Sequence, residues 1–104
     1  MKFSVYSVTD NLNTVMRRIG YHPIAHSDRG ELNCVRPLMG RDYPRFHAYV
    51  KEEKDKILFS LHLDQKRPSY GNETAHSGDY EGGVVKKEAY RIQEILILSR
   101  SSET

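Results

Sequence analysis

The sequence predicts a two-layer α+β sandwich in which a mainly antiparallel sheet carries two helices on one face. The central run "RFHAYVKEEKDKILFSLHLD" reads as two strands joined by a charged turn. One amphipathic segment with helical spacing precedes this run in the chain, and another follows it. Both helices need an apolar sheet face to cover, and the central hairpin offers one. The predicted order of elements is β-α-β-β-β-α.

The first strand and the first helix are predicted from the opening of the chain. Residues 2–8, "KFSVYSV", contain alternating β-branched and aromatic residues, which is typical of a strand. Thr9 or Asp10 can then cap a helix that runs to about Ile19 and is stopped by Gly20. The apolar stripe of this helix consists of Leu12, Val15, Met16 and Ile19.

Two short strands are expected next, over residues 21–26 and 31–36. The phrase "SDRG" between them has the composition of a tight turn. Pro23 and Pro37 each remove a backbone donor, so these strands are expected at a sheet edge or with irregular pairing.

The central hairpin can be given a register. If Lys51 lies opposite Lys56, the strands pair three apolar sets: Val50 with Ile57, Ala48 with Phe59, and Phe46 with Leu61. A slip of one residue would turn this apolar face to solvent, which favours the register. The polar face of the hairpin then carries Arg45, His47, Tyr49, Leu58, Ser60, His62 and Asp64.

The last element is a helix over about residues 83–98, whose apolar positions are Val85, Ala89, Ile92 and either Ile95 or Leu96. A chain of 104 residues with 38% apolar residues fits one core. We therefore expect residues 1–98 to form a single α+β domain and residues 99–104 to form a flexible C-terminal tail.

Composition excludes some classes of protein. Sixteen basic against fourteen acidic residues leave a net charge of +2, which is not the concentrated charge of a dedicated nucleic-acid binder. The only cysteine, Cys34, rules out an internal disulfide framework, and its apolar neighbours indicate a small core residue. The chain has no signal-peptide or membrane-spanning pattern, so we expect a cytoplasmic protein that does not enter a membrane.

The long polar stretch over residues 65–83 indicates a site, because loops of such length in small domains are commonly functional. We predict that it closes as a lid over the polar hairpin face. There, His62 and Asp64 share one face, His47 reaches in from the partner strand, and His76 or Asp79 arrives from the loop. These nitrogen and oxygen ligands would suit zinc or manganese, with His47, His62, Asp64 and His76 as the predicted metal ligands. Alternatively, the cluster is only the ordinary polar face of an antiparallel sheet.

The same residues allow general acid-base chemistry. Histidine titrates near neutrality, and a neighbouring aspartate can orient it. The predicted catalytic residues are His62, Asp64 and His76, and other polar residues assist them as ligand-binding groups. This supporting set comprises Arg45, His47, Tyr49, Lys66, Asp79 and Tyr80.

Two further interpretations stay open. In the first, the protein is a nucleic-acid or nucleotide-binding module in which Arg45, Lys66 and Arg67 supply charge and Tyr49, Tyr70 or Tyr80 supply stacking surfaces. In the second, the protein is a homodimeric interaction module whose loop packs against another copy.

Several phrases also carry a resemblance: "VMRRIGYHP", "YPRFHAY", "LHLDQKRPSY", "AHSGDYEG" and "VVKKEAYRI". Together they resemble a family of small, uncharacterised bacterial proteins of about this length, and the similarity covers most of the chain. No activity, ligand or fold is attached to that family, so the resemblance implies no mechanism and no catalytic residue. It does imply a free-standing small protein.

Overall fold

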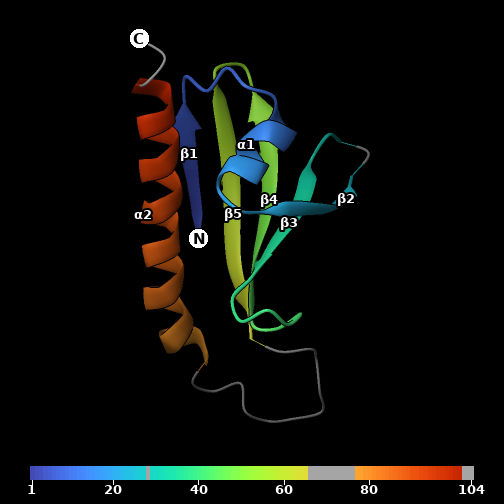
Figure 1. Cartoon of the computed structure of the whole chain (residues 1–104), viewed down its shortest axis with the longest axis vertical. Helices are drawn as coiled ribbons and strands as arrows, with labels where there is room; N and C mark the ends of the chain where they lie inside the picture. The colour runs from blue at the N-terminus through green and yellow to red at the C-terminus, as the bar shows by residue number, and fades with distance from the viewer. Residues whose placement is uncertain (28, 66–76, 102–104) are drawn as a thin grey trace.

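The computed structural model describes residues 1–27, 29–65 and 77–101. In chain order the elements are β1 (Lys2–Tyr6), α1 (Leu12–Arg18), β2 (His22–His26), β3 (Leu32–Pro37), β4 (Arg45–Glu53), β5 (Lys56–Asp64) and α2 (Ser77–Ser101). The five strands form one antiparallel sheet with the order β1-β5-β4-β3-β2 (Figure 1). No helix in the described ranges is both long enough and apolar enough to cross a membrane.

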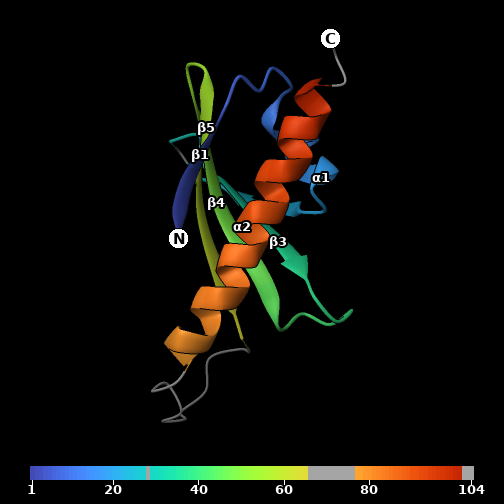
Figure 2. The ribbon, with the colours of Figure 1, turned by 90° about the vertical axis from the view of Figure 1, so that its left-hand side faces the viewer.

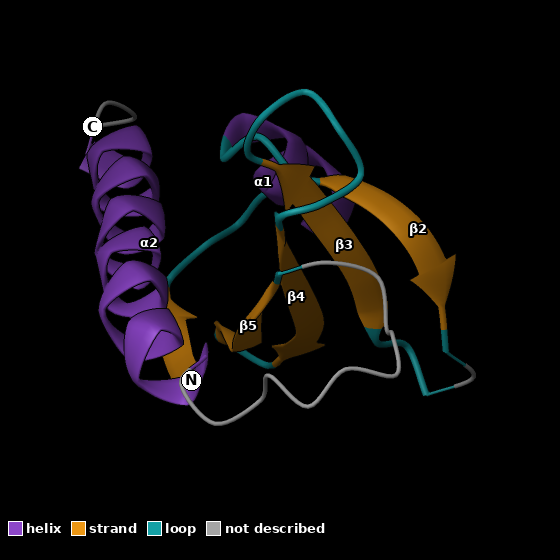
Figure 3. Ribbon diagram, turned by 90° about the horizontal axis from the view of Figure 1, so that it is seen from below, coloured by secondary structure: helices purple, strands orange, loops and turns teal. Residues whose placement is uncertain are grey.

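The predicted α+β class is confirmed, and both helices lie on one side of the sheet (Figure 3). A single cluster of buried residues joins the apolar stripes of the two helices to the inward side chains of the strands. The predicted order of elements is one strand short. Four strands, β2 to β5, separate the helices, and they correspond to the two short strands and the two hairpin strands expected from the sequence, so the order β-α-β-β-β-α counted one strand too few.

Helix α1 begins at a different cap from the one expected. Asn11 is the N-cap, and its side-chain oxygen accepts a hydrogen bond of 2.9 Å from the amide of Thr14. Asp10 instead forms an ion pair of 2.7 Å with Arg18. Gly20 stops the helix as predicted, since it adopts a φ of +92° that favours glycine.

The predicted register of the β4–β5 hairpin is wrong by two residues. Glu53 lies opposite Lys56, so the turn contains only Lys54 and Asp55, and Lys54 has a positive φ of 39°. Such two-residue turns match the twist of the strands they join. The apolar pairs are therefore Val50 with Phe59, Ala48 with Leu61, and Phe46 with Leu63. Side chains alternate with a period of two, so this shift leaves the predicted assignment of residues to faces intact.

Strand β2 is an edge strand, as its proline suggested, and all five of its residues are exposed. Its pairing with β3 shifts between Pro23 and Ala25. Cys34 on β3 is completely buried in the core, which confirms its predicted place.

Helix α2 is longer than predicted, and Figure 2 shows it running obliquely across the sheet. It buries Val85, Ala89, Ile92 and Leu96, as the spacing indicated. It begins at Ser77, so residues 77–83 are helical and the predicted 65–83 loop is wrong over that part. It also continues to Ser101, past the boundary expected at residue 98.

A buried carboxylate anchors α2. The side chain of Glu88, only 5% exposed, accepts a hydrogen bond of 2.7 Å from the hydroxyl of Tyr21 and two of 2.8 Å from Arg91. Arg36 on β3 lies 3.5 Å from the same carboxylate, and Arg91 also donates to the carbonyl of Ile19 at 2.6 Å. Burial, together with the adjacent Glu88 charge, raises the pKa of Tyr21 above its ordinary range. The cluster thus joins α2 to β3 and to the chain that leaves α1.

Removing this carboxylate should destabilise the protein strongly. Glu88→Ala leaves the Tyr21 hydroxyl and the Arg91 guanidinium without their shared partner, and we expect a loss of about 3–5 kcal/mol in the free energy of unfolding. Urea denaturation measures this loss. Glu94→Ala is the matched control because Glu94 is exposed on the same helix. Equal effects of the two substitutions would contradict the anchoring role.

Cys34 should make the free energy of unfolding depend on pH in the alkaline range. Burial raises the pKa of its thiol from 9.0 to about 11. Because the unfolded chain then loses a proton that the native state keeps, stability should fall as pH rises from 9 towards 11, by about 1 kcal/mol at about pH 10. Urea denaturation at about pH 8 and pH 10 measures the slope, which Cys34→Ala should reduce. An unchanged slope in the variant would show that the thiol is not responsible.

Candidate functional site

The sheet face turned away from both helices, called here the open face, is organised in rows by the strand pairing. One row runs from Lys2 through Ser60 and Tyr49 to Asn33. The next row contains Ser4, Leu58 and Lys51. On the other side of the first row, His47 lies directly opposite His62, and beyond this pair Arg45 lies opposite Asp64.

Asp64 and His47 are brought together as predicted, but they form a closed cluster. The Asp64 carboxylate accepts from Arg45 Nε at 3.1 Å and from His47 Nδ1 at 3.1 Å. The other ring nitrogen of His47 is hydrogen bonded to the Asn33 side chain. Arg45 also lies over the Tyr43 ring, 4.6 Å from its centroid. These groups satisfy one another.

The predicted metal site is not assembled by the described residues alone. Both ring nitrogens of His47 are engaged, and Nε2 of His62 lies 3.2 Å from the Ser60 hydroxyl. Within residues 1–27, 29–65 and 77–101, no group of three or more His, Cys, Asp or Glu side chains is placed to hold a metal ion. His76 lies outside the described residues, so the ligand set that includes it stays a prediction.

Other predicted residues also stay untested. Lys66, Arg67 and Tyr70 lie outside the described residues, as does most of the predicted lid. Asp79 and Tyr80 fall in the backbone of α2 and not in a loop.

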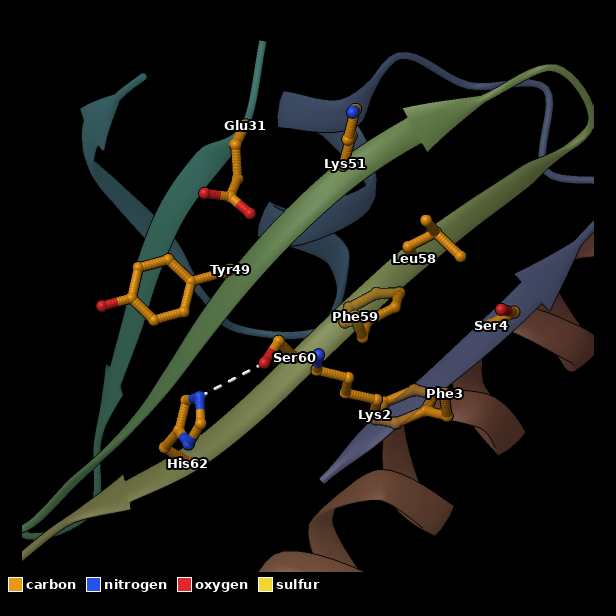
Figure 4. A pocket seen from close by; sticks show the side chains of 10 residues that line it. All are labelled: Lys2, Phe3, Ser4, Glu31, Tyr49, Lys51, Leu58, Phe59, Ser60 and His62. Atoms are coloured by element: carbon orange, nitrogen blue, oxygen red, sulfur yellow. Dashed lines mark hydrogen bonds between the residues drawn. The ribbon is translucent and has the colours of Figure 1, made fainter. Parts of the chain in front are cut away.

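A hollow of about 610 Å³ lies on the open face beside the His47 cluster (Figure 4). It extends from β1 across β5 and β4 to Glu31, the residue that precedes β3. We call it the open-face groove. The residues that line it are Lys2, Phe3, Ser4, Glu31, Tyr49, Lys51, Leu58, Phe59, Ser60 and His62.

Tyr49 is the fixed aromatic surface of the groove. Its ring stacks on the His47 ring with centroids 4.7 Å apart, and it meets the edge of the His62 ring at 5.8 Å. Because the Asp64 cluster holds His47 in place, it also positions Tyr49. The predicted residues His47 and Asp64 therefore support the groove from beside it, while Tyr49 and His62 line it.

The charged groups of the groove contrast with those of the neighbouring cluster. Among the residues that the structure describes, the side chains of Lys2, Lys51 and Glu31 form no ion pair or hydrogen bond, and neither does the Tyr49 hydroxyl. Arg45, His47 and Asp64 are all paired a few residues away. The groove thus carries polar groups that the described part of the chain leaves available to a ligand.

The sequence analysis missed Lys2, Ser4, Glu31 and Lys51 as members of a site. Lys2 and Ser4 reach the groove only because β1 pairs with β5, and Glu31 reaches it only because β3 pairs with β4. The alternation in the first strand could have placed Lys2 and Ser4 on its polar side. It could not have indicated which strand lay next to them.

Comparison of the chain with protein-family models, with curated proteins and with solved structures finds no match. The resemblance to small bacterial proteins therefore stays a prediction. Functional inference has to start from the chemistry of the open-face groove.

The His47–Asp64 contact should contribute to folding in its own right. Asp64→Asn removes the charge that orients His47 and Arg45, and we expect the free energy of unfolding to fall by about 1 kcal/mol because the groups are partly exposed. A double-mutant cycle with His47→Gln, measured by urea denaturation, isolates the contact. Strictly additive effects would show that the two side chains are not coupled.

Proposed function

We propose that the protein binds a small organic anion in the open-face groove. The observation that carries the proposal is the pair of lysines, Lys2 and Lys51, whose ammonium groups find no partner in the described residues although the charges beside them are paired. With Glu31, the groove has a formal charge of +1 when His62 is neutral.

The shape and lining of the groove support a small ligand. Its volume of about 610 Å³ lies in the usual range for such sites, about 300–1,000 Å³. Tyr49 and Leu58 offer an apolar surface on which the organic part of the ligand can pack, and the lysines supply the attraction for its charge. Ser4 and Ser60 add hydroxyl groups that can hydrogen bond to an anion.

The pairing of the charged groups beside the groove favours binding over catalysis. Asp64 is engaged by Arg45 and His47, so it does not serve as the partner that the predicted acid-base set with His62 requires. That set also needs His76, outside the described residues. Likewise, the predicted nucleic-acid module loses Arg45, which is held by Asp64 and by the Tyr43 ring. The homodimer and the cytoplasmic location stay predictions.

The proposal is tested by amide NMR titration of the protein with aromatic carboxylates, sugar phosphates and nucleotides. We expect saturable shifts at Tyr49, Ser60 and His62 with at least one of these classes. The double variant Lys2→Gln/Lys51→Gln should weaken that binding about tenfold, as two exposed charge contacts of up to about 1 kcal/mol each imply.

The matched control is Lys86→Gln/Lys87→Gln, which removes the same charge from exposed positions on α2. It should leave binding unchanged at moderate salt. The proposal is wrong if no compound shifts the groove amides, or if the α2 variant weakens binding as much as the groove variant.

A further inference from the structure

The two ends of the open-face groove differ in chemistry. From the β1 end, the side chain of Lys2 reaches across to Ser60, its partner across the strands, while Ser4 lies apart from both, two residues further along β1 (Figure 4). At the other end, Glu31 presents a carboxylate. The middle is occupied by the Tyr49 ring and Leu58. A ligand that matches this arrangement carries an anionic group, a flat apolar body and an edge of hydrogen-bond donors, in that order.

We infer that the ligand is a nucleotide, with its phosphate at Lys2, its base against Tyr49 and the donor edge of the base at Glu31. This inference rests on the proposed function and names the ligand class for the same groove. It uses Lys2, Tyr49, Lys51 and Glu31, none of which belongs to the closed cluster around Asp64.

The Tyr49 ring is placed to stack with a flat base. The ring packs on His47, and Figure 4 shows it nearly broadside when the open face is viewed from the front. A planar base in van der Waals contact with this ring lies about 3.5 Å from it. Lys51 is two residues further along β4 on the same face, about 7 Å away along the strand, so its methylene groups can contact the edge of the base.

Glu31 gives the groove a preference among bases. An ionised carboxylate accepts hydrogen bonds with both oxygens and donates none. Guanine presents two neighbouring N–H donors on its Watson–Crick edge, whereas uracil presents a single N–H between two carbonyl oxygens that a carboxylate repels. Guanine is therefore the best match and uracil the poorest. A bidentate pair of this kind contributes about 1–3 kcal/mol to discrimination, so the expected preference is about tenfold.

The phosphate end is set by Lys2 and Ser60. Lys2 is on β1 and Glu31 precedes β3, and these two strands are three strand spacings apart in the sheet, so the backbones at the two residues are separated by about 14 Å across the strands. The long Lys2 side chain spans part of this distance, as its position beside Ser60 in Figure 4 illustrates. The remaining length suits one nucleotide unit laid across the strands, with the base over β4 and the phosphate toward β1.

The test compares guanosine monophosphate (GMP) with uridine monophosphate (UMP), guanosine and ribose 5-phosphate in amide NMR titrations. We expect GMP to bind about tenfold more tightly than UMP and more tightly than either of its own fragments.

Tyr49→Leu should weaken GMP binding about tenfold through loss of stacking. Lys2→Gln should weaken GMP but not guanosine, and Glu31→Gln should remove the preference for GMP over UMP. Glu94→Gln and Lys86→Gln, both on α2, are matched controls that should change nothing.

The outcomes separate the nucleotide inference from the proposed function. If ribose 5-phosphate or an aromatic carboxylate binds the groove as tightly as GMP, the nucleotide inference is wrong while anion binding stands. If no compound binds, both fail. A short guanine-containing single-stranded RNA is titrated separately. If it binds more tightly than GMP through the same residues, the ligand is a nucleotide within an RNA strand. If it binds equally or more weakly, the ligand is a free nucleotide. Thermal melting of each variant shows whether that variant is folded. If Tyr49→Leu is unfolded, Glu31→Gln provides an independent test.

Discussion

The pairing of β4 with β5 is the constraint on which the rest of the structure depends. A turn of only two residues, Lys54 and Asp55, fixes nine residues of each strand in one register. That register directs one set of alternate side chains into the core, where both helices cover them, and the other set to the open face. β1 and β3 add to the two outer edges of this hairpin and extend both faces. The groove exists because the extension places Lys2 and Glu31 beside the polar row of the hairpin.

The distribution of paired and unpaired charges separates structural polar groups from those available for recognition. On the helix side, Glu88 is buried and accepts hydrogen bonds from Tyr21 and Arg91, which offset the cost of burying its charge. On the open face, Asp64 satisfies Arg45 and His47, and through His47 it steadies the ring of Tyr49. The groove next to it is different, because its lysines have no partner in the described residues. A rigid aromatic ring beside available charges favours recognition of a ligand that has both features.

Much of the fold could be predicted from the sequence, because periodicity alone determines which residues face the core. Alternation placed Phe46, Ala48 and Phe59 inward and His47 outward, and helical spacing found the buried stripe of α2. The register could not be predicted, since a shift by two residues preserves the same faces and only the turn distinguishes the two. The groove could not be found either, because strand order results from tertiary packing and not from local pattern. Likewise, the apolar spacing predicted a helix only from about residue 83, and the chain instead forms a continuous helix from Ser77 through Gly82 and Gly83.

The most direct measurement of the central claim is a set of intermolecular nuclear Overhauser effects between the protein and bound GMP. If the open-face groove binds a nucleotide, the aromatic protons of Tyr49 and the methyl protons of Leu58 should show contacts to the base and ribose protons. Tyr90, an exposed residue of α2 that does not line the groove, should show none and serves as the internal reference. Contacts confined to Tyr90, or an absence of contacts to Tyr49 while GMP is bound, would contradict the account.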